Sequence, residues 1–205
     1  MIIIRRLAVI VAAVLVALFI APAASSQAET RGVDAVTRLQ IQHYALQLAD
    51  TRPIFESDCT YFTSRVLWLA GLEPTEDWRD DSSDTSKLAT KWLNPGPTTT
   101  AALADEFVSY VTGSNGFAEK KEIDWSDNTA AGAVLGDILA WDWDGPANGT
   151  IDHVAIVTGF TDDGYPLVTQ HSPTRINRGW SWDTAAGDWI ENTHPGSKVW
   201  LIHLR

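Results

Sequence analysis

The chain has 205 residues, is 45% hydrophobic and carries a formal net charge of −11 at pH 7. This length suits one domain with a sizeable core. The acidic balance excludes nucleic acid and anionic lipid surfaces as favoured partners, because both repel negative charge.

The first residues have the layout of a secretory signal peptide. Two arginines precede an apolar run over 7–20, and small residues with candidate cleavage sites after positions 23, 24 and 28 follow. The alternative is an uncleaved membrane anchor, but the run is short for a span of about 20 residues. We therefore expect a signal peptide over 1–28 and a functional domain over 29–205. The mature protein is expected to be secreted or associated with the cell envelope, without stable membrane insertion.

Two amphipathic helices are predicted by apolar residues at helical spacing on either side of an irregular segment. The first covers 33–49, with Val36 on its inward side, and the other covers 99–111, with Leu103 inward. The segment between 72 and 99 is rich in proline, serine and aspartate and is expected to be irregular.

A further helix is predicted over Asp58–Ala70. Asp58 is expected to cap its start and Gly71 stands at its end. Cys59 lies three residues before Phe62, so it is expected at the head of the buried face.

Strand patterns dominate the second half of the chain. A turn before β-branched runs and a central "TDDGY" turn predict a hairpin and two further strands, over 136–143, 153–160, 166–172 and 197–205. The stretch 180–192 is expected to be a loop. Helices first and strands later indicate an α+β domain with an antiparallel sheet.

The single cysteine, Cys59, is unusual in a chain expected to be exported. Structural cysteines pair in oxidising compartments, and Cys59 has no partner within the chain. It is either a reactive thiol or a buried residue that acts as a small apolar side chain. Its position in the first turn of a predicted helix favours a thiolate, because the helix dipole stabilises an anion there.

A nucleophilic thiol needs a base and a group that orients the base. His153 opens a predicted strand and is our candidate base, although it could instead be a structural residue satisfied by Asp152 or a backbone carbonyl. His171 is the candidate orienting residue if Phe160 faces Leu167 across the turn. Gln170 points to the other face, so the strand register decides between Gln170 and His171.

The segments "SDCTYFTSRVLWLAGL", "GDILAWDWDGPANGTIDHVAIVTG" and "PLVTQHS" together resemble the bacterial putative amidase domain family, a branch of the papain-like cysteine hydrolases related to the NlpC and CHAP cell-wall hydrolases. The resemblance implies a papain-like fold with N-terminal helices packed on an antiparallel sheet. It also implies that Cys59 is the nucleophile, His153 the base and His171 the orienting residue. Two departures from the family pattern, Tyr61 and Arg65, could alter the substrate pocket.

We therefore expect a secreted cysteine hydrolase, an amidase or peptidase that cleaves an amide bond through a thioacyl-enzyme. Its expected partner is a peptide or amide substrate of the cell envelope, with peptidoglycan as one candidate, and no cofactor is expected. One alternative is a non-catalytic module that binds peptide or glycan on the same fold. Another is an acyl or peptidyl transferase, in which an amine replaces water.

Two other sequence patterns, a partial calcium-binding loop and a pair of tryptophans, lie in or beside the loop at 142–152. Asp144, Asn148 and Asp152 fit part of a calcium-binding loop, but Pro146 and the missing bidentate glutamate do not. We expect a connector that delivers His153, and no metal site. Trp141 and Trp143 share one face of a predicted strand, where core packing is a more frequent role than lining a groove.

Overall fold

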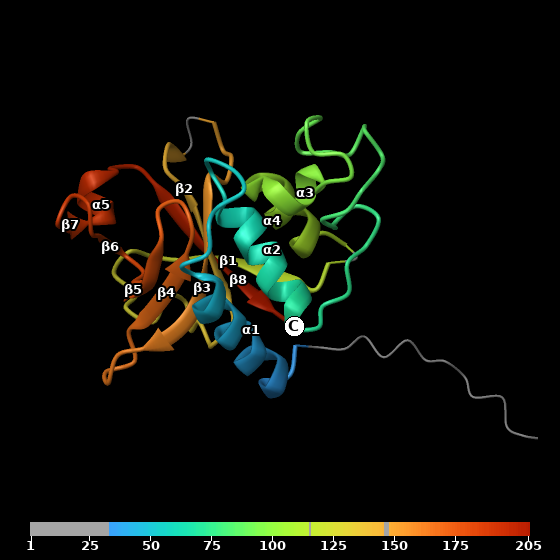
Figure 1. Cartoon of the computed structure of the whole chain (residues 1–205). Helices are drawn as coiled ribbons and strands as arrows, with labels where there is room; N and C mark the ends of the chain where they lie inside the picture. The colour runs from blue at the N-terminus through green and yellow to red at the C-terminus, as the bar shows by residue number, and fades with distance from the viewer. Residues whose placement is uncertain (1–32, 115, 146–147) are drawn as a thin grey trace, which may run out of the picture. The chain divides into compact units, whose positions relative to one another are not determined.

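Figure 1 shows the computed structural model, which describes residues 33–114, 116–145 and 148–205. The predicted signal peptide lies outside these residues. The helices are α1 (Ala35–Leu48), α2 (Cys59–Leu69), α3 (Thr99–Ala102), α4 (Ala104–Thr112) and α5 (Ile190–Thr193). The strands are β1 (Ala118–Glu122), β2 (Ile138–Asp142), β3 (His153–Phe160), β4 (Pro166–Gln170), β5 (Arg175–Gly179), β6 (Trp182–Asp183), β7 (Asp188–Trp189) and β8 (Lys198–Leu204). Within the described ranges, no helix has the length and apolar character to cross a membrane.

Six of the strands form one antiparallel sheet in the order β1-β8-β2-β3-β4-β5. Strands β6 and β7 form a separate small hairpin. The predicted α+β class and antiparallel sheet are confirmed. Sequence patterns missed both edge strands, β1 and β5, because their residues are mostly charged or polar and exposed. Polar edges of this kind protect a sheet from pairing with other chains.

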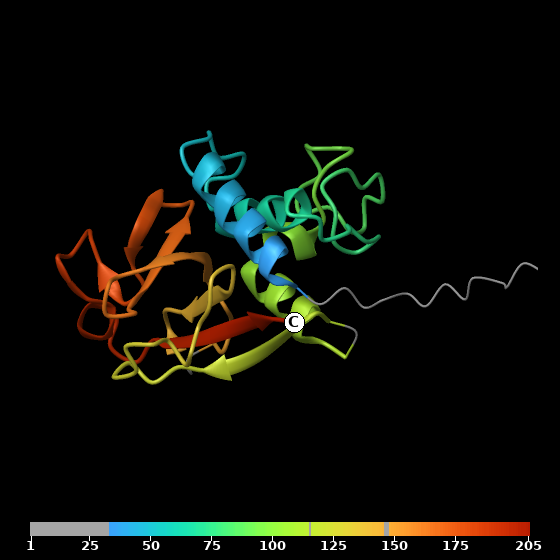
Figure 2. The same ribbon diagram turned by 90° about the horizontal axis from the view of Figure 1, so that it is seen from below.

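The two faces of the sheet have separate cores. Along β3, Val154 and Ile156 pack with the apolar sides of α1, α2 and α4. Ala155 and Val157 point to the opposite face, where Trp141 and other aromatic residues pack. Figure 2 shows the helices gathered on one side of the sheet. This alternation with period two determines which face each side chain of the hairpin reaches.

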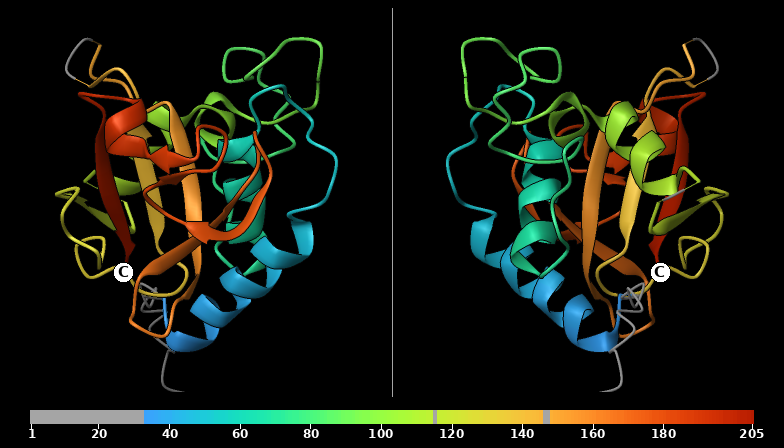
Figure 3. Two further views of the ribbon diagram at one scale, coloured as in Figure 1. Left: turned by 90° about the vertical axis from the view of Figure 1, so that its left-hand side faces the viewer. Right: turned by 90° about the vertical axis from the view of Figure 1, so that its right-hand side faces the viewer.

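The helices on that side differ from prediction in two respects. The expected helix over 99–111 is divided at Leu103, which has an extended backbone and a side chain that is 50% exposed. Val36, predicted to face inward, is 63% exposed, whereas Ile41 and Ala45 are the buried residues of α1. Figure 3 shows α1 and α2 as neighbours joined by the short connection after α1.

Asp137, just before β2, connects the helices to the sheet. Its buried carboxylate lies 2.7 Å from Arg38 Nη1 on α1 and 2.9 Å from His203 Nδ1 on β8. It also accepts hydrogen bonds from the backbone N–H groups of Val134 and Leu204. Asp137 therefore braces α1, β2 and β8 at the end of the sheet remote from His153.

Candidate functional site

Cys59 is the first residue of α2 and is 2% exposed. Its Sγ lies 3.7 Å from Thr60 Oγ1 and also accepts a hydrogen bond from the backbone N–H of Val154 on β3. The position agrees with the prediction that Cys59 heads the buried face of this helix. The N–H groups of a first helical turn have no acceptor within the helix, so they are available to an anion.

His153 is the first residue of β3 and interacts with the Cys59 thiol. Burial is the largest single influence and raises the pKa of Cys59, but the hydrogen bond and charge of His153, together with hydrogen bonds from Val154 and Thr60, lower that pKa to about 7. Among the described residues, the buried Nε2 of His153 has no hydrogen-bond partner. Catalytic hydrogen bonds in unliganded enzymes are often loose in this way and tighten when substrate binds.

Two indole rings flank His153. The centroid of its ring lies 5.7 Å from that of Trp141 and 6.0 Å from that of Trp143. Both tryptophans also line the same pocket as His153. Trp141 is also buried in the core on this face of the sheet and Trp143 packs against that core, so the pair combines the expected core packing with a lining role.

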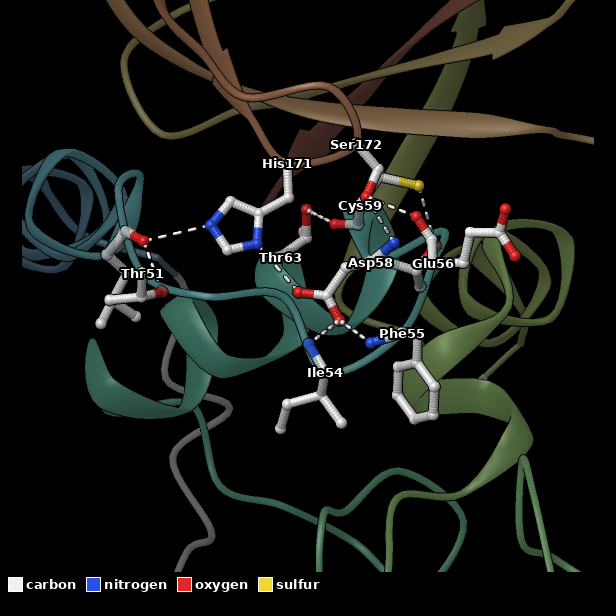
Figure 4. Close-up of polar contacts among 11 residues, drawn as sticks. Thr51, Ile54, Phe55, Glu56, Asp58, Cys59, Thr63, His171 and Ser172 are labelled. Carbon is white, nitrogen blue, oxygen red and sulfur yellow. Dashed lines mark hydrogen bonds and ion pairs between the residues drawn. The ribbon is translucent and has the colours of Figure 1, made fainter.

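His171 lies on the other side of the sheet and does not meet His153. Its Nδ1 lies 2.8 Å from Asp58 Oδ2 and its Nε2 lies 3.1 Å from the carbonyl oxygen of Leu48. Its ring also stacks on Phe62, with 4.4 Å between centroids. Figure 4 shows the His171 ring directed at Asp58. Both ring nitrogens are thus occupied, and the expected orienting contact with His153 is absent.

The pairing of β3 with β4, together with the alternation of side chains along each strand, explains why His171 does not meet His153. We expected Phe160 opposite Leu167, but Phe160 pairs with Pro166, and an irregularity between Val157 and Gly159 shifts the register again. Ile156 therefore faces Thr169 rather than His171. Together the two displacements move the pairing by two residues, which leaves every side chain on its face. His171 shares the helix face of Ile156, whereas His153, three residues before Ile156 on β3, lies on the opposite face with Gln170.

Asp58 precedes α2, as expected, but its side chain does not cap the helix. Instead, its Oδ1 accepts hydrogen bonds from the backbone N–H groups of Ile54 and Phe55. Its own backbone N–H donates to Ser172 Oγ at 2.8 Å. In Figure 4 the carboxylate and the Cys59 sulfur point in different directions. Asp58 thus fixes the loop before the thiol rather than the helix end.

A cavity of about 130 Å³ opens beside His153. It is lined by aromatic, polar and charged side chains, including those of Trp180, Gln170, Arg175, Asp183 and His194. His194 lies in a loop-like segment of the sequence, and Arg175 and Asp183 belong to no motif, so the sequence singles out none of the three. Among these lining residues, only Gln170 could be inferred from the sequence, because the alternation along β4 makes it point to the opposite face from His171.

No metal site was expected, and no group of three or more metal-ligating side chains occurs among the described residues. The loop after β2 includes positions outside those residues. Its described part contains a hydrogen bond from Trp143 N–H to Asp152 Oδ2 and one from Thr150 N–H to Asn148 Oδ1. These are the contacts of an ordinary turn-rich connector.

The fold and site define an α+β protein that brings a buried cysteine at a helix start against a histidine at a strand start. Over residues 42–194 the chain matches the family described as "Putative amidase domain". The match covers most of its length, and the chain belongs to this family. Comparisons with curated proteins and with solved structures found no significant match. Family membership supports an amidase-type hydrolase.

Proposed function

We propose that this protein is a cysteine hydrolase that cleaves amide bonds outside the cytoplasm. The contact between Cys59 and His153 carries the proposal, because it lowers the pKa of a buried thiol to about 7. A thiol in an apolar site without such a partner would have a raised pKa and low reactivity. The signal-like N-terminus supports export.

In the proposed reaction, the Cys59 thiolate attacks the amide carbonyl carbon and a tetrahedral oxyanion forms. The Cys59 backbone N–H, in the first turn of α2, is a candidate donor to that oxyanion. The intermediate collapses as the C–N bond breaks and the leaving nitrogen takes a proton from the His153 imidazolium. A thioester to Cys59 and a free amine result.

The second half of the reaction restores the enzyme. His153, now neutral, takes a proton from water as the oxygen attacks the thioester carbonyl. The carbon–sulfur bond then breaks, releasing a carboxylic acid and regenerating the Cys59 thiolate beside the His153 imidazolium. The residue that holds the imidazole in place is proposed to be Gln170 rather than His171. Gln170 lines the same pocket as His153, and its amide nitrogen is held by the carbonyl of Pro173.

The substrate class follows from the proposed location, and we propose a peptide or amide of the cell envelope. The test is incubation of the wild-type protein and the Cys59→Ala variant with purified peptidoglycan and a panel of N-acylated peptides. Mass spectrometry is expected to find matched amine and carboxylic acid products from the wild type alone. Equal product formation by Cys59→Ala would overturn the proposal, and Arg178→Met, on an exposed part of β5, serves as the control variant.

A further inference from the structure

Two of the tryptophans beside His153 have indole N–H groups that lack an acceptor among the described residues. The indole N–H groups of Trp141 and Trp180 are buried and have no hydrogen-bond partner among the described residues. Both tryptophans line the pocket. A buried polar group left without a partner costs free energy, and sites that bind ligands often retain such groups for the ligand to satisfy.

Arg175 adds a positive charge to this lining. Its side chain is 18% exposed, and its two polar contacts among the described residues are long: 3.3 Å to the carbonyl of Trp182 and 3.4 Å to Asp183 Oδ1. A guanidinium has five N–H donors arranged as a fork that matches a carboxylate. Donors of Arg175 therefore remain for a ligand.

Asp183 does not use up the donors of Arg175, because most contacts of its carboxylate are with other groups. Its Oδ1 accepts hydrogen bonds from the backbone N–H groups of Ala185 and Ala186, and its Oδ2 lies 3.8 Å from His194 Nε2. Although burial raises the pKa of Asp183, these N–H groups and the charges of Arg175 and His194 lower it overall. Asp183 thus stays ionised and fixes Arg175 and the adjoining turn.

We propose that this pocket binds a carboxylate of the substrate, held by the guanidinium of Arg175. Apolar parts of the same group would pack on Trp141, Trp143 and Trp180. The inference rests on the proposed function, because it is the proposed base, His153, that places this pocket beside the reacting bond. The preferred substrates are then amides that carry a free carboxylate close to the bond that is cleaved.

Binding can be measured without catalysis in the Cys59→Ala variant. The probes are N-acetylalanine and N-acetylglycine, each compared with its neutral amide, N-acetylalaninamide and N-acetylglycinamide. Tryptophan fluorescence reports binding, because three indoles line the pocket. Each acid is expected to bind about tenfold tighter than its amide, as charge-assisted hydrogen bonds to a guanidinium allow.

Three further substitutions in the Cys59→Ala background make the test specific. Arg175→Met is expected to abolish the preference for acid over amide, and Arg175→Lys to retain part of it. Asp183→Asn keeps the Oδ1 acceptor and removes the negative charge, so it is expected to tighten acid binding. Arg178→Met, on the same strand but exposed, removes the same charge and is expected to leave the preference unchanged.

Equal affinities for acids and amides, or a preference that persists in Arg175→Met, would overturn the inference. Circular dichroism checks that each variant is folded. Failure of the proposed function is distinguishable, because it would appear as no hydrolysis by the wild type while acid binding by Cys59→Ala persists. Hydrolysis by the wild type of neutral and acidic amides at equal rates, without acid binding, would instead remove only this inference.

Discussion

His171 and Asp58 form a buried ion pair although 113 positions separate them in the chain, with 2.8 Å between Nδ1 and Oδ2. The other ring nitrogen, Nε2, faces the carbonyl oxygen of Leu48. Both ring nitrogens therefore lie against oxygen atoms, one of a carboxylate and one of a backbone carbonyl. The pair therefore ties the end of α1 to the residue that precedes Cys59.

Replacement of His171 by alanine is expected to destabilise the fold. The Asp58 carboxylate would remain buried without its partner at Nδ1, and breaking a buried pair costs about 3–5 kcal/mol. Urea denaturation of the wild type, His171→Ala, Asp58→Asn and the double variant measures the loss and the coupling between the two residues. The double variant is expected to lose less than the sum of the single losses.

The same His171→Ala variant separates a structural role from a role in orienting His153. We expect the pKa of the Cys59 thiol to change much less than in His153→Ala, because the ring nitrogens of His171 contact Asp58 and Leu48 and His171 does not contribute to the thiol pKa. A shift in thiol pKa as large as that of His153→Ala, with stability unchanged, would contradict this interpretation.

The reactivity of Cys59 is expected to depend on pH with a midpoint near 7. The thiolate is the reactive form, so alkylation by iodoacetamide is slow below a pH of about 7 and fast above it. In His153→Ala the two largest lowering contributions disappear and burial is opposed only by the hydrogen bonds of Val154 and Thr60, so the thiol pKa is expected to rise well above 7. The measurement is the alkylation rate across this range, with His43→Ala on the exposed side of α1 as control.

Gln170 is expected to position His153. Gln170→Ala should lower kcat by up to about 100-fold with little change in KM, because a misplaced base slows the chemical step rather than binding. It should also move the midpoint of Cys59 alkylation upward, which loss of packing alone would not do. Gln42→Ala removes a glutamine that donates to the carbonyl of Thr158 from α1, and it is the matched control. An unchanged midpoint in Gln170→Ala would contradict this role.

The sequence predicted the parts of the fold that have strong local patterns. Strand β3 begins at His153 and ends at Phe160, as expected from its β-branched run, and Cys59 lies at the start of α2. Patterns of this kind depend on residues near one another in the chain, so they can be recognised without knowledge of the tertiary structure.

Contacts set by register and by distant segments could not be predicted. The irregularity between Val157 and Gly159 changes the pairing of β3 with β4, so that Ile156 faces Thr169, and nothing local to the "HVAIVTGF" run indicates it. The partner of His171 is Asp58, which already had a plausible role as a helix cap. The pocket residues Arg175 and Asp183 come from segments without periodicity, so only the folded chain brings them beside His153.

Asp137 is expected to contribute more to stability than any exposed aspartate. It is fully buried and connects Arg38, His203 and two backbone N–H groups. Asp137→Ala would leave the Arg38 guanidinium, whose side chain is 14% exposed, without its carboxylate. Removal of one member of a buried pair costs about 3–5 kcal/mol. Urea denaturation measures this loss.

The control for Asp137→Ala is Asp162→Ala, which changes an exposed aspartate in the turn after β3 and is expected to change stability by at most about 0.5 kcal/mol. The chemistry at Cys59 offers a second check. Asp137 precedes β2, and its carbonyl oxygen accepts a hydrogen bond from the N–H of Val157, which lies further along β3 than His153. Folded Asp137→Ala protein is therefore expected to keep the wild-type alkylation midpoint, and a shifted midpoint would show that the brace also positions the thiol.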